Sequence, residues 1–166
     1  PSPPLPPGGP VELELIDPLS LLNQSDHNNI YNWAAAVYSQ LSATGSVRAK
    51  IVNDQQMSKA HKKFSNIDGT TDVLTFDLNP MNPSNNFEHK VLDTDLIICI
   101  DQATRQAELH NHSPAHELLL YIIHGTLHCL GYDDHTDKDF KTMHNKEDQL
   151  LTAAGIGPLF DRGTHS

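Results

Sequence analysis

Cysteine is scarce in this sequence, with Cys99 and Cys129 the only two among 166 residues. Both lie in apolar stretches, so we expect two buried free thiols rather than a disulfide, which fits a reducing cytoplasm. Long hydrophobic runs are lacking too, because no stretch approaches the ~18 consecutive apolar residues of a membrane span. We therefore expect a cytoplasmic protein that does not enter a membrane.

The first residues also lack the basic and apolar segments of a secretory signal. Residues 1–10 are rich in proline and glycine and are predicted to form a disordered leader, while residues 158–166 are predicted to be a frayed tail. The chain does not begin with methionine, which is compatible with a longer natural N-terminus. Residues 11–157 remain for one domain, a length that suits a single core.

Basic residues are few, with 11 lysines and arginines against 21 acidic residues and a formal charge of −10. An acidic protein binds polyanions poorly unless its cations cluster, because affinity comes from local neutralisation of phosphates. Lys59, Lys62 and Lys63 form such a cluster, and together with Phe76 they would suit a cleft for a polyanion. A solvated helix face is the alternative interpretation of these lysines.

Patterns along the chain predict an α/β (α+β) fold. Alternating or continuous apolar runs predict strands at 11–17, 46–52, 72–77 and 95–100, and helical periodicity predicts helices at 26–41, 55–64, 102–109, 113–130 and 138–154. This order predicts a single domain, with a mixed sheet of about four strands and helices packed on it. The helix at 113–130 is apolar on nearly all sides, so it should be central and buried.

Polar residues at the predicted helix starts are candidate caps. Ser25 or Asp26 would cap the first helix, and Asp101 would cap the helix at 102–109. Ser113 would cap the central helix, with Pro114 at its first position, where proline costs no hydrogen bond.

The central helix carries two histidines, His124 and His128, four residues apart. Residues at this spacing lie on one helix face, about 5–6 Å apart, and can share a metal ion. Gly131 suits the end of the helix, since glycine adopts the left-handed conformation freely. The turn would bring Asp134 or His135 towards the imidazoles. Two histidines and a third ligand, with one position open, predict a catalytic divalent metal site.

The same spacing occurs in the H-E-x-x-H motif of zinc proteases, which makes a protease one alternative function. Here Gly125 occupies the position of the glutamate that serves as general base. Without that carboxylate, peptide hydrolysis by water loses its proton acceptor, so the sequence disfavours a protease.

Five segments together resemble the YbeY-type endoribonuclease family, the bacterial rRNA maturation factors. The strongest likeness is the metal motif, and the others follow in the same order as in the family, over roughly residues 46–151. The segments are Asp68-x-x-Thr71-Asp-Val-Leu-Thr-Phe76, Asp95-Leu-Ile-Ile, Ala103-x-Arg-Gln-Ala107, His112-Ser-x-x-x-Glu117-Leu118 and His124-Gly-x-Leu-His128-x-x-Gly131-Tyr-Asp133. Downstream, Met143 and Glu147 stand in the family's register.

This resemblance implies an α/β metalloprotein with one zinc ion per chain. It implies cleavage of single-stranded RNA in the maturation of the 16S rRNA 3′ end and in ribosome quality control, with the ribosome as partner and no action on DNA. Lys59, Thr71 and Phe76 would then contact the substrate. A zinc-stabilised adaptor that docks on the ribosome without catalysis is a second alternative, which the acidic charge favours.

The sequence departs from the family pattern at the third metal ligand. The family places a histidine ten positions after the first, and here that position is Asp134, with His135 beside it. The unchanged spacing to Met143 and Glu147 favours Asp134. Ligand chemistry favours His135, since imidazole is the commoner zinc donor.

A second departure concerns a basic residue that the family places before the D-x-P-T-D segment. Ser65 stands there, and Lys62 or Lys63 could supply the missing cation.

Metal-bound histidines also need a hydrogen-bond acceptor that fixes their tautomer, and Asp133 or Glu117 could serve.

Overall fold

The computed structural model describes residues 11–80 and 90–157. The predicted leader at 1–10 and the tail at 158–166 lie outside these residues, as does most of the loop predicted at 79–89. The elements along the chain are β1 (Glu12–Ile16), α1 (Gln24–Tyr38), β2 (Thr44–Val52), α2 (Asp54–Ser65), β3 (Val73–Asp77), β4 (Val91–Cys99), α3 (Ile100–His110), α4 (Pro114–Cys129) and α5 (Asp137–Ala153). Their order is the predicted one.

The four strands form one mixed sheet in the order β1-β2-β4-β3. β1 pairs with β2 in parallel, β2 pairs with β4 in parallel, and β3 runs antiparallel to β4 at the edge. The predicted fold class, a single α/β domain with a mixed sheet of about four strands, is confirmed.

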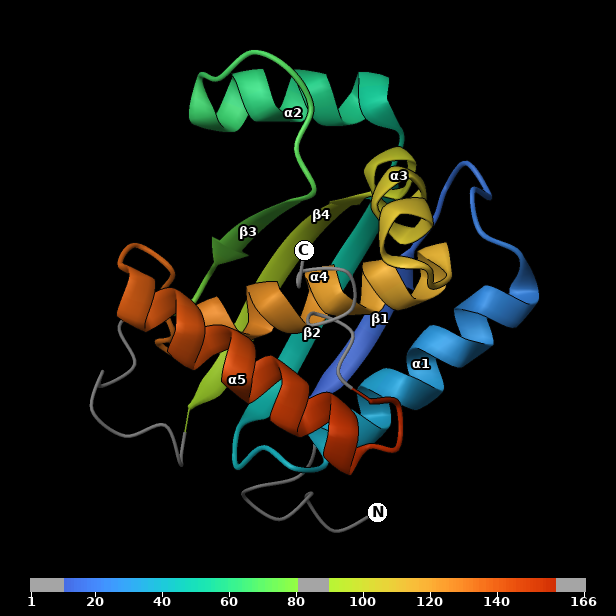
Figure 1. The fold of residues 1–166 in the computed structure, drawn as a ribbon. Helices are drawn as coiled ribbons and strands as arrows, with labels where there is room; N and C mark the ends of the chain where they lie inside the picture. The colour runs from blue at the N-terminus through green and yellow to red at the C-terminus, as the bar shows by residue number, and fades with distance from the viewer. Residues whose placement is uncertain (1–10, 81–89, 158–166) are drawn as a thin grey trace, which may run out of the picture.

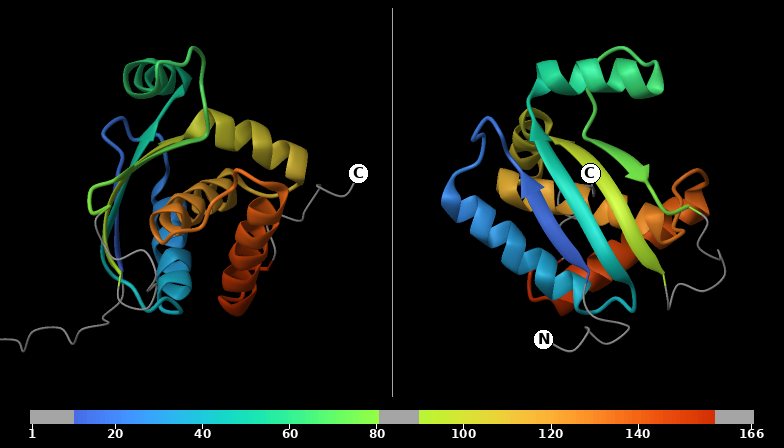
Figure 2. Two further views of the ribbon diagram at one scale, coloured as in Figure 1. Left: turned by 90° about the vertical axis from the view of Figure 1, so that its left-hand side faces the viewer. Right: turned by 180° about the vertical axis from the view of Figure 1, so that it is seen from behind.

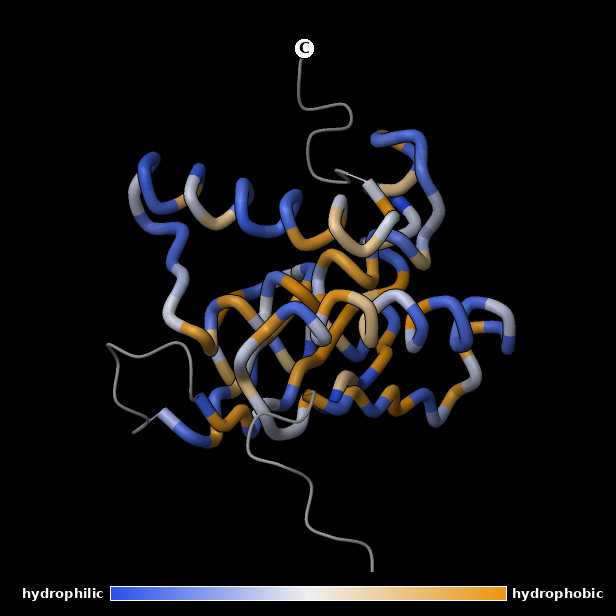
Figure 3. Tube along the Cα trace, turned by 90° about the horizontal axis from the view of Figure 1, so that it is seen from below, coloured by the Kyte–Doolittle hydropathy of each residue, from blue (hydrophilic) through white to orange (hydrophobic). Residues whose placement is uncertain are grey.

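Helices α1, α3, α4 and α5 lie on one face of the sheet, and α2 lies beyond one end of the strands (Figures 1 and 2). Within the described residues, no helix covers the opposite face. The most hydrophobic segments lie in the middle of the molecule, between the sheet and these helices (Figure 3). Among the described helices, none combines the length and the apolar character needed to cross a membrane.

Helix α4 is the central helix, with residues buried on nearly all its sides, as predicted. It lies so close to the sheet that a β-carbon on Gly125 would come within 2.5 Å of Leu96 Cδ2 and 3.0 Å of Thr75 Oγ1. Gly125 therefore faces β3 and β4, and a side chain at this position would require the Leu96 side chain or α4 to shift.

Strand β4 begins at Val91, four residues before the predicted start at residue 95. The added segment alternates, with Leu92 and Thr94 buried, while Asp93 and Asp95 both bind Arg48 of the neighbouring strand. Two aspartates in a short segment are unusual for a strand, and the arginine that offsets them is distant in sequence.

Two of the predicted caps are wrong. Asn23, rather than Ser25 or Asp26, caps α1 and accepts a hydrogen bond from the Asp26 backbone N–H at 2.8 Å. Helix α3 begins at Ile100, and the carboxylate of Asp101 accepts a hydrogen bond from the Asp54 backbone N–H instead.

The cap predicted for α4 is confirmed, because the Ser113 side chain accepts from the His116 backbone N–H and Pro114 is the first helical residue. Cys99 and Cys129 are both free and buried, as predicted.

Candidate metal centre

His124 and His128 lie on one face of α4, near its C-terminal end. Their Nε2 atoms are 3.0 Å apart, and the two ring centroids are separated by 4.6 Å. The helix ends at Cys129, and Gly131 follows with a φ of 104°, a left-handed conformation that reverses the chain. The turn then returns towards the imidazoles, as the sequence predicted.

Asp134 is the residue that this turn brings to the two histidines. Its Oδ2 lies 3.5 Å from Nε2 of His124 and 3.7 Å from Nε2 of His128. His135 is 83% exposed, and its Nδ1 lies 3.1 Å from Oδ2 of Asp133. His124, His128 and Asp134 therefore form a group of described residues that could hold a metal ion, and the turn itself offers a second group in Asp133, Asp134 and His135.

The spacing of these three ligand atoms fits a metal ion. Zinc bonds to nitrogen and oxygen of about 2.0–2.2 Å place the ligands of a tetrahedral site about 3.4 Å apart. The three observed distances between the ligand atoms, 3.0, 3.5 and 3.7 Å, lie on either side of that value. The donor set, two imidazoles and one carboxylate, leaves the fourth position open.

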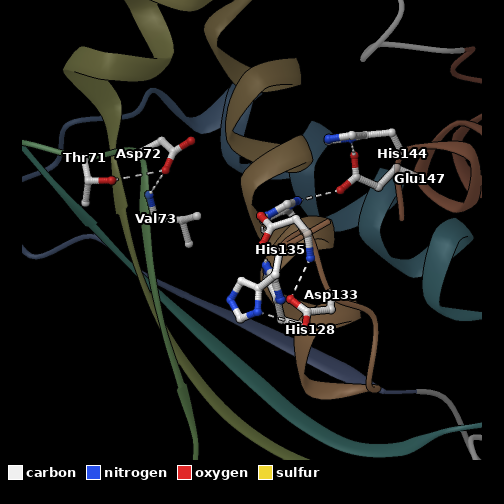
Figure 4. A network of polar contacts seen from close by, with 10 residues as sticks. Thr71, Asp72, Val73, His128, Asp133, His135, His144 and Glu147 are labelled. Atoms are coloured by element: carbon white, nitrogen blue, oxygen red, sulfur yellow. Dashed lines mark hydrogen bonds and ion pairs between the residues drawn. The ribbon is translucent and has the colours of Figure 1, made fainter. Parts of the chain in front are cut away.

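Glu147 is the acceptor that fixes the orientation of His124. Its Oε1 lies 2.7 Å from Nδ1 of His124, and its Oε2 lies 2.9 Å from Nδ1 of His144 on its own helix. The Glu147 side chain is completely buried. Figure 4 shows Glu147 and His144 side by side, next to the end of the helix that carries His128. A hydrogen bond at Nδ1 leaves Nε2 of His124 free to bind a metal.

Sequence reasoning missed this role of Glu147. Neither of the two residues proposed for it contacts the histidines in this way: Asp133 accepts from the Asp134 backbone N–H, and Glu117 pairs with His112. A signal was present, because Glu147 lies in the buried stripe of α5 with Met143, Leu150 and Leu151. A glutamate inside an apolar stripe needs a buried partner.

The two histidines differ in their electrostatic surroundings. Burial disfavours the charged form of His124, but the hydrogen bond to Glu147 and the charges of Glu147 and Asp134 outweigh it and raise its pKa. Burial and the neighbouring His124 lower the pKa of His128. His128 is therefore the imidazole that more readily offers a neutral nitrogen to a metal ion.

A cleft of about 400 Å³ opens beside the cluster, between α3, α4, α5 and the start of β3. Its described lining includes four carboxylates, from Asp72, Glu117, Asp134 and Glu147, and three imidazoles. None of its described lining residues is a lysine or an arginine. A polyanion that enters this cleft therefore needs bound cations.

The lysines predicted to act near the metal do not line this cleft. Lys59, Lys62 and Lys63 are exposed on α2, where Lys62 pairs with Asp68 at 3.3 Å and Lys63 lies over the ring of Phe64. Helix α2 stands beyond the end of the sheet (Figure 1), so the structure does not bring these lysines together with His124.

Phe76 also lies away from the cluster. Successive side chains of a strand alternate between faces, so with Thr75 towards α4 Phe76 points to the opposite face of the sheet. There it packs edge-on against Phe64 and lines a separate apolar cavity of about 470 Å³. Thr71 donates a hydrogen bond to Asp72, which does line the cleft (Figure 4).

The fold and this cluster define the class: an α/β protein whose central helix carries a site of the metal-binding type. A family model described as endoribonuclease YbeY matches residues 21–155. The chain belongs to the endoribonuclease YbeY family. The predicted family and the predicted class of enzyme, a hydrolase that cleaves RNA, are confirmed by this match and by the relatives below.

A relative from Halalkalibacterium halodurans, named endoribonuclease YbeY, is 30% identical over 156 residues, which cover 88% of this chain and 97% of that protein. A second, from Staphylococcus saprophyticus and of the same name, is 36% identical over 106 residues, or 63% of this chain and 69% of that protein. The solution structure of TM1509 from Thermotoga maritima matches with a TM-score of 0.53 and 19% identity, covering 94% of this chain and 99% of that one. At this identity the structural match shows the fold alone.

Proposed function

We propose that this protein is a zinc-dependent endoribonuclease that cuts single-stranded RNA during maturation of the 16S rRNA 3′ end and ribosome quality control. Family membership supports the type of reaction. The single observation that carries the proposal is the triangle of His124, His128 and Asp134, whose ligand atoms are 3.0 to 3.7 Å apart at the edge of an open cleft.

One zinc ion would be held at this triangle by two neutral imidazoles and the Asp134 carboxylate. A zinc ion held in this way lowers the pKa of a bound water towards about 7 and polarises a phosphoryl oxygen. We assign the third position to Asp134 rather than His135, because His135 is exposed and turned to Asp133.

The remaining residues of the site position these ligands. Glu147 keeps Nδ1 of His124 protonated and Nε2 available. Asp133 accepts the backbone N–H of Asp134 at 2.7 Å, which holds the turn in place. We therefore assign Asp133 a positioning role, and we place Lys59, Lys62, Lys63 and Thr71 along the path of the RNA outside the cleft. Phe76, which lines the separate cavity on the opposite face of the sheet, is left out of this path.

A protease function is disfavoured further by the position of Gly125. In the H-E-x-x-H motif this residue is the general base, but here it faces Leu96 and Thr75 and has no room for a carboxylate. The cluster of His124, His128 and Asp134 therefore lacks the general base that a zinc protease with this motif uses.

Cleavage of RNA by metal-depleted and zinc-reloaded protein tests this function. We expect cleavage of a labelled single-stranded RNA only after reloading, no cleavage of DNA of the same sequence, and less cleavage as salt rises. His128→Ala should lose the zinc ion of the triangle and the activity, while His116→Ala, on the same helix but outside the cluster, should keep both. Cleavage by His128→Ala that lacks the ion of the triangle would indicate a contaminating nuclease. A loaded wild-type protein that never cuts RNA would favour the adaptor.

A further inference from the structure

The cleft contains more carboxylates than one divalent ion at the triangle of His124, His128 and Asp134 would neutralise. Asp134 and Glu147 lie at the triangle, where one divalent ion would balance two negative charges. Asp72 and Glu117 line the same cleft, and no described lysine or arginine lines it with them. If RNA is the substrate, as proposed above, its phosphates meet Asp72 and the Glu117–His112 pair there, without a lysine or arginine in the described lining to bind them.

Three potential ligands meet beside that part of the cleft. The side chains of His110, His112 and Glu117 have ligand atoms that all lie within 4.8 Å of one another. Nε2 of His112 forms a short hydrogen bond with Oε2 of Glu117, and Nδ1 of His110 lies 4.0 Å from Oε1 of Glu117. His110 and Glu117 both line the cleft.

Burial makes this group unlike a surface cluster. The side chains of His112 and Glu117 are 1% and 4% exposed, and that of His110 is 26% exposed. Burial outweighs the opposing effect of His110 and, with a smaller contribution from the charge of Asp72, raises the pKa of Glu117 to about 7. A carboxylate in such surroundings gains from a nearby cation more than an exposed carboxylate does.

The three residues of this group come from one short stretch of chain, which runs from the end of α3 to the first turn of α4. Helix α3 ends at His110, and Asn111 takes a left-handed φ of 60° that turns the chain. The His112 backbone N–H donates to the Ala107 carbonyl at 3.1 Å, and Ser113 caps α4, whose first turn carries Glu117. Each ligand is thus fixed by local backbone structure.

The group is separate from the triangle described above. Glu117 precedes His124 by seven residues on α4, which is about 10 Å along a helix axis. Ions of a two-metal hydrolytic site lie about 3.5–4 Å apart, so the two groups would not share one reaction centre. A cation at Glu117 would instead meet a neighbouring phosphate of a strand bound in the cleft.

We propose that His110, His112 and Glu117 form a second divalent-metal site, which neutralises the cleft for a polyanion. Two imidazoles and a carboxylate suit zinc and related late divalent ions rather than magnesium or calcium. Binding replaces the proton shared by His112 and Glu117 with the metal ion. The competing interpretation is that the His112–Glu117 pair only stabilises the connection between α3 and α4.

Titration of the full chain with Co²⁺, followed by visible absorption, and with Zn²⁺, followed by calorimetry, tests this proposal. We expect two ions per wild-type chain at saturation, one in His128→Ala, one in Glu117→Gln and none in the double variant. Glu108→Gln, an exposed glutamate on α3, is the matched control and should bind two. Because Glu117 is buried, His110→Ala provides a second variant with less risk to folding, and it should also bind one.

Two results would overturn the second site. One is a folded His128→Ala that binds no ion, and the other is Glu117→Gln or His110→Ala binding two ions with unchanged affinity. Metal binding is measured without RNA, so the outcome is distinct from that of the cleavage assay. A wild-type chain that binds two ions but cuts no RNA would contradict the proposed function and leave the second site standing.

Discussion

Glu147 accepts a hydrogen bond from Nδ1 of His124 at 2.7 Å, and this contact joins α5 to the helix that carries both histidines. The buried carboxylate also accepts from His144, so one side chain satisfies two imidazoles. Because the orientation of a metal-binding histidine depends on such an acceptor, α5 takes part in the proposed metal centre without contributing a ligand.

Replacing Glu147 with glutamine should weaken zinc binding about 10- to 100-fold, the range found when an acceptor behind a metal ligand is lost. Glutamine keeps the size of the side chain but removes its charge, so the basicity of His124 falls. Competition with a chelator of known affinity measures the change. Glu108→Gln is the control on an exposed helix face, and equal affinities for both variants would contradict the positioning role of Glu147.

The third ligand can be decided by two single variants. Asp134→Ala should lose most of the zinc affinity, because the triangle then has only two ligands. His135→Ala should bind zinc almost as the wild type does, since His135 is exposed and paired with Asp133. Metal titration measures both. Loss of metal in His135→Ala with retention in Asp134→Ala would reverse the assignment.

Most of the fold could be predicted because the patterns that define it are local. The periodicity of α4 and the cap at Ser113 are written in consecutive residues, and both were predicted correctly. The start of β4 was missed because Asp93 is accommodated by Arg48 on another strand. Asp101 was misassigned for the same reason, since its partner is the Asp54 backbone, 47 residues earlier.

In the candidate site, too, local features could be predicted and contacts between distant segments could not. The approach of His124 and His128 follows from helical spacing, and the return of Asp134 follows from Gly131 and the register of the motif. Which acceptor lies behind His124 depends on how α5 packs against α4, and no pattern within either helix states that. The distance between the α2 lysines and the cleft likewise depends on the direction of α2 relative to the sheet.

The ion pair between Asp54 and Arg105 should make stability depend on acid pH. Hydrogen bonds from Arg105 lower the pKa of Asp54 to about 2, against about 3.9 in an unfolded chain. A lowered pKa stabilises the folded state above about pH 4, and this contribution is lost as the pH falls towards 2. Both side chains are nearly half exposed, at 48% and 40%, so the contribution should stay below about 1 kcal/mol.

Arg105→Ala should therefore lower the free energy of unfolding at pH 6 and have almost no effect near pH 2. Urea unfolding of both proteins across this range measures the difference. Asp54→Asn should show the same convergence at low pH. A loss of stability that is equal at every pH would mean that Arg105 acts through packing instead.

Gly125 lies close to the sheet, between the proposed metal ligand His124 and the buried Thr126. Alanine favours a helix over glycine by about 1 kcal/mol. Overpacking a buried contact costs about 1–3 kcal/mol, and a new β-carbon 2.5 Å from Leu96 Cδ2 requires either the Leu96 side chain or α4 to shift. The steric term should therefore exceed the gain in helix propensity.

We expect Gly125→Ala to lower the free energy of unfolding by about 1 kcal/mol. It should also weaken zinc binding, because a shift of α4 moves both histidines relative to Asp134. Shortening the opposing side chain with Leu96→Val should reduce the cost of Gly125→Ala, with a coupling of at least about 0.5 kcal/mol in a double-mutant cycle. Chemical unfolding of the four proteins gives this coupling. Additive effects, or a stabilising Gly125→Ala, would contradict the close contact between α4 and β4.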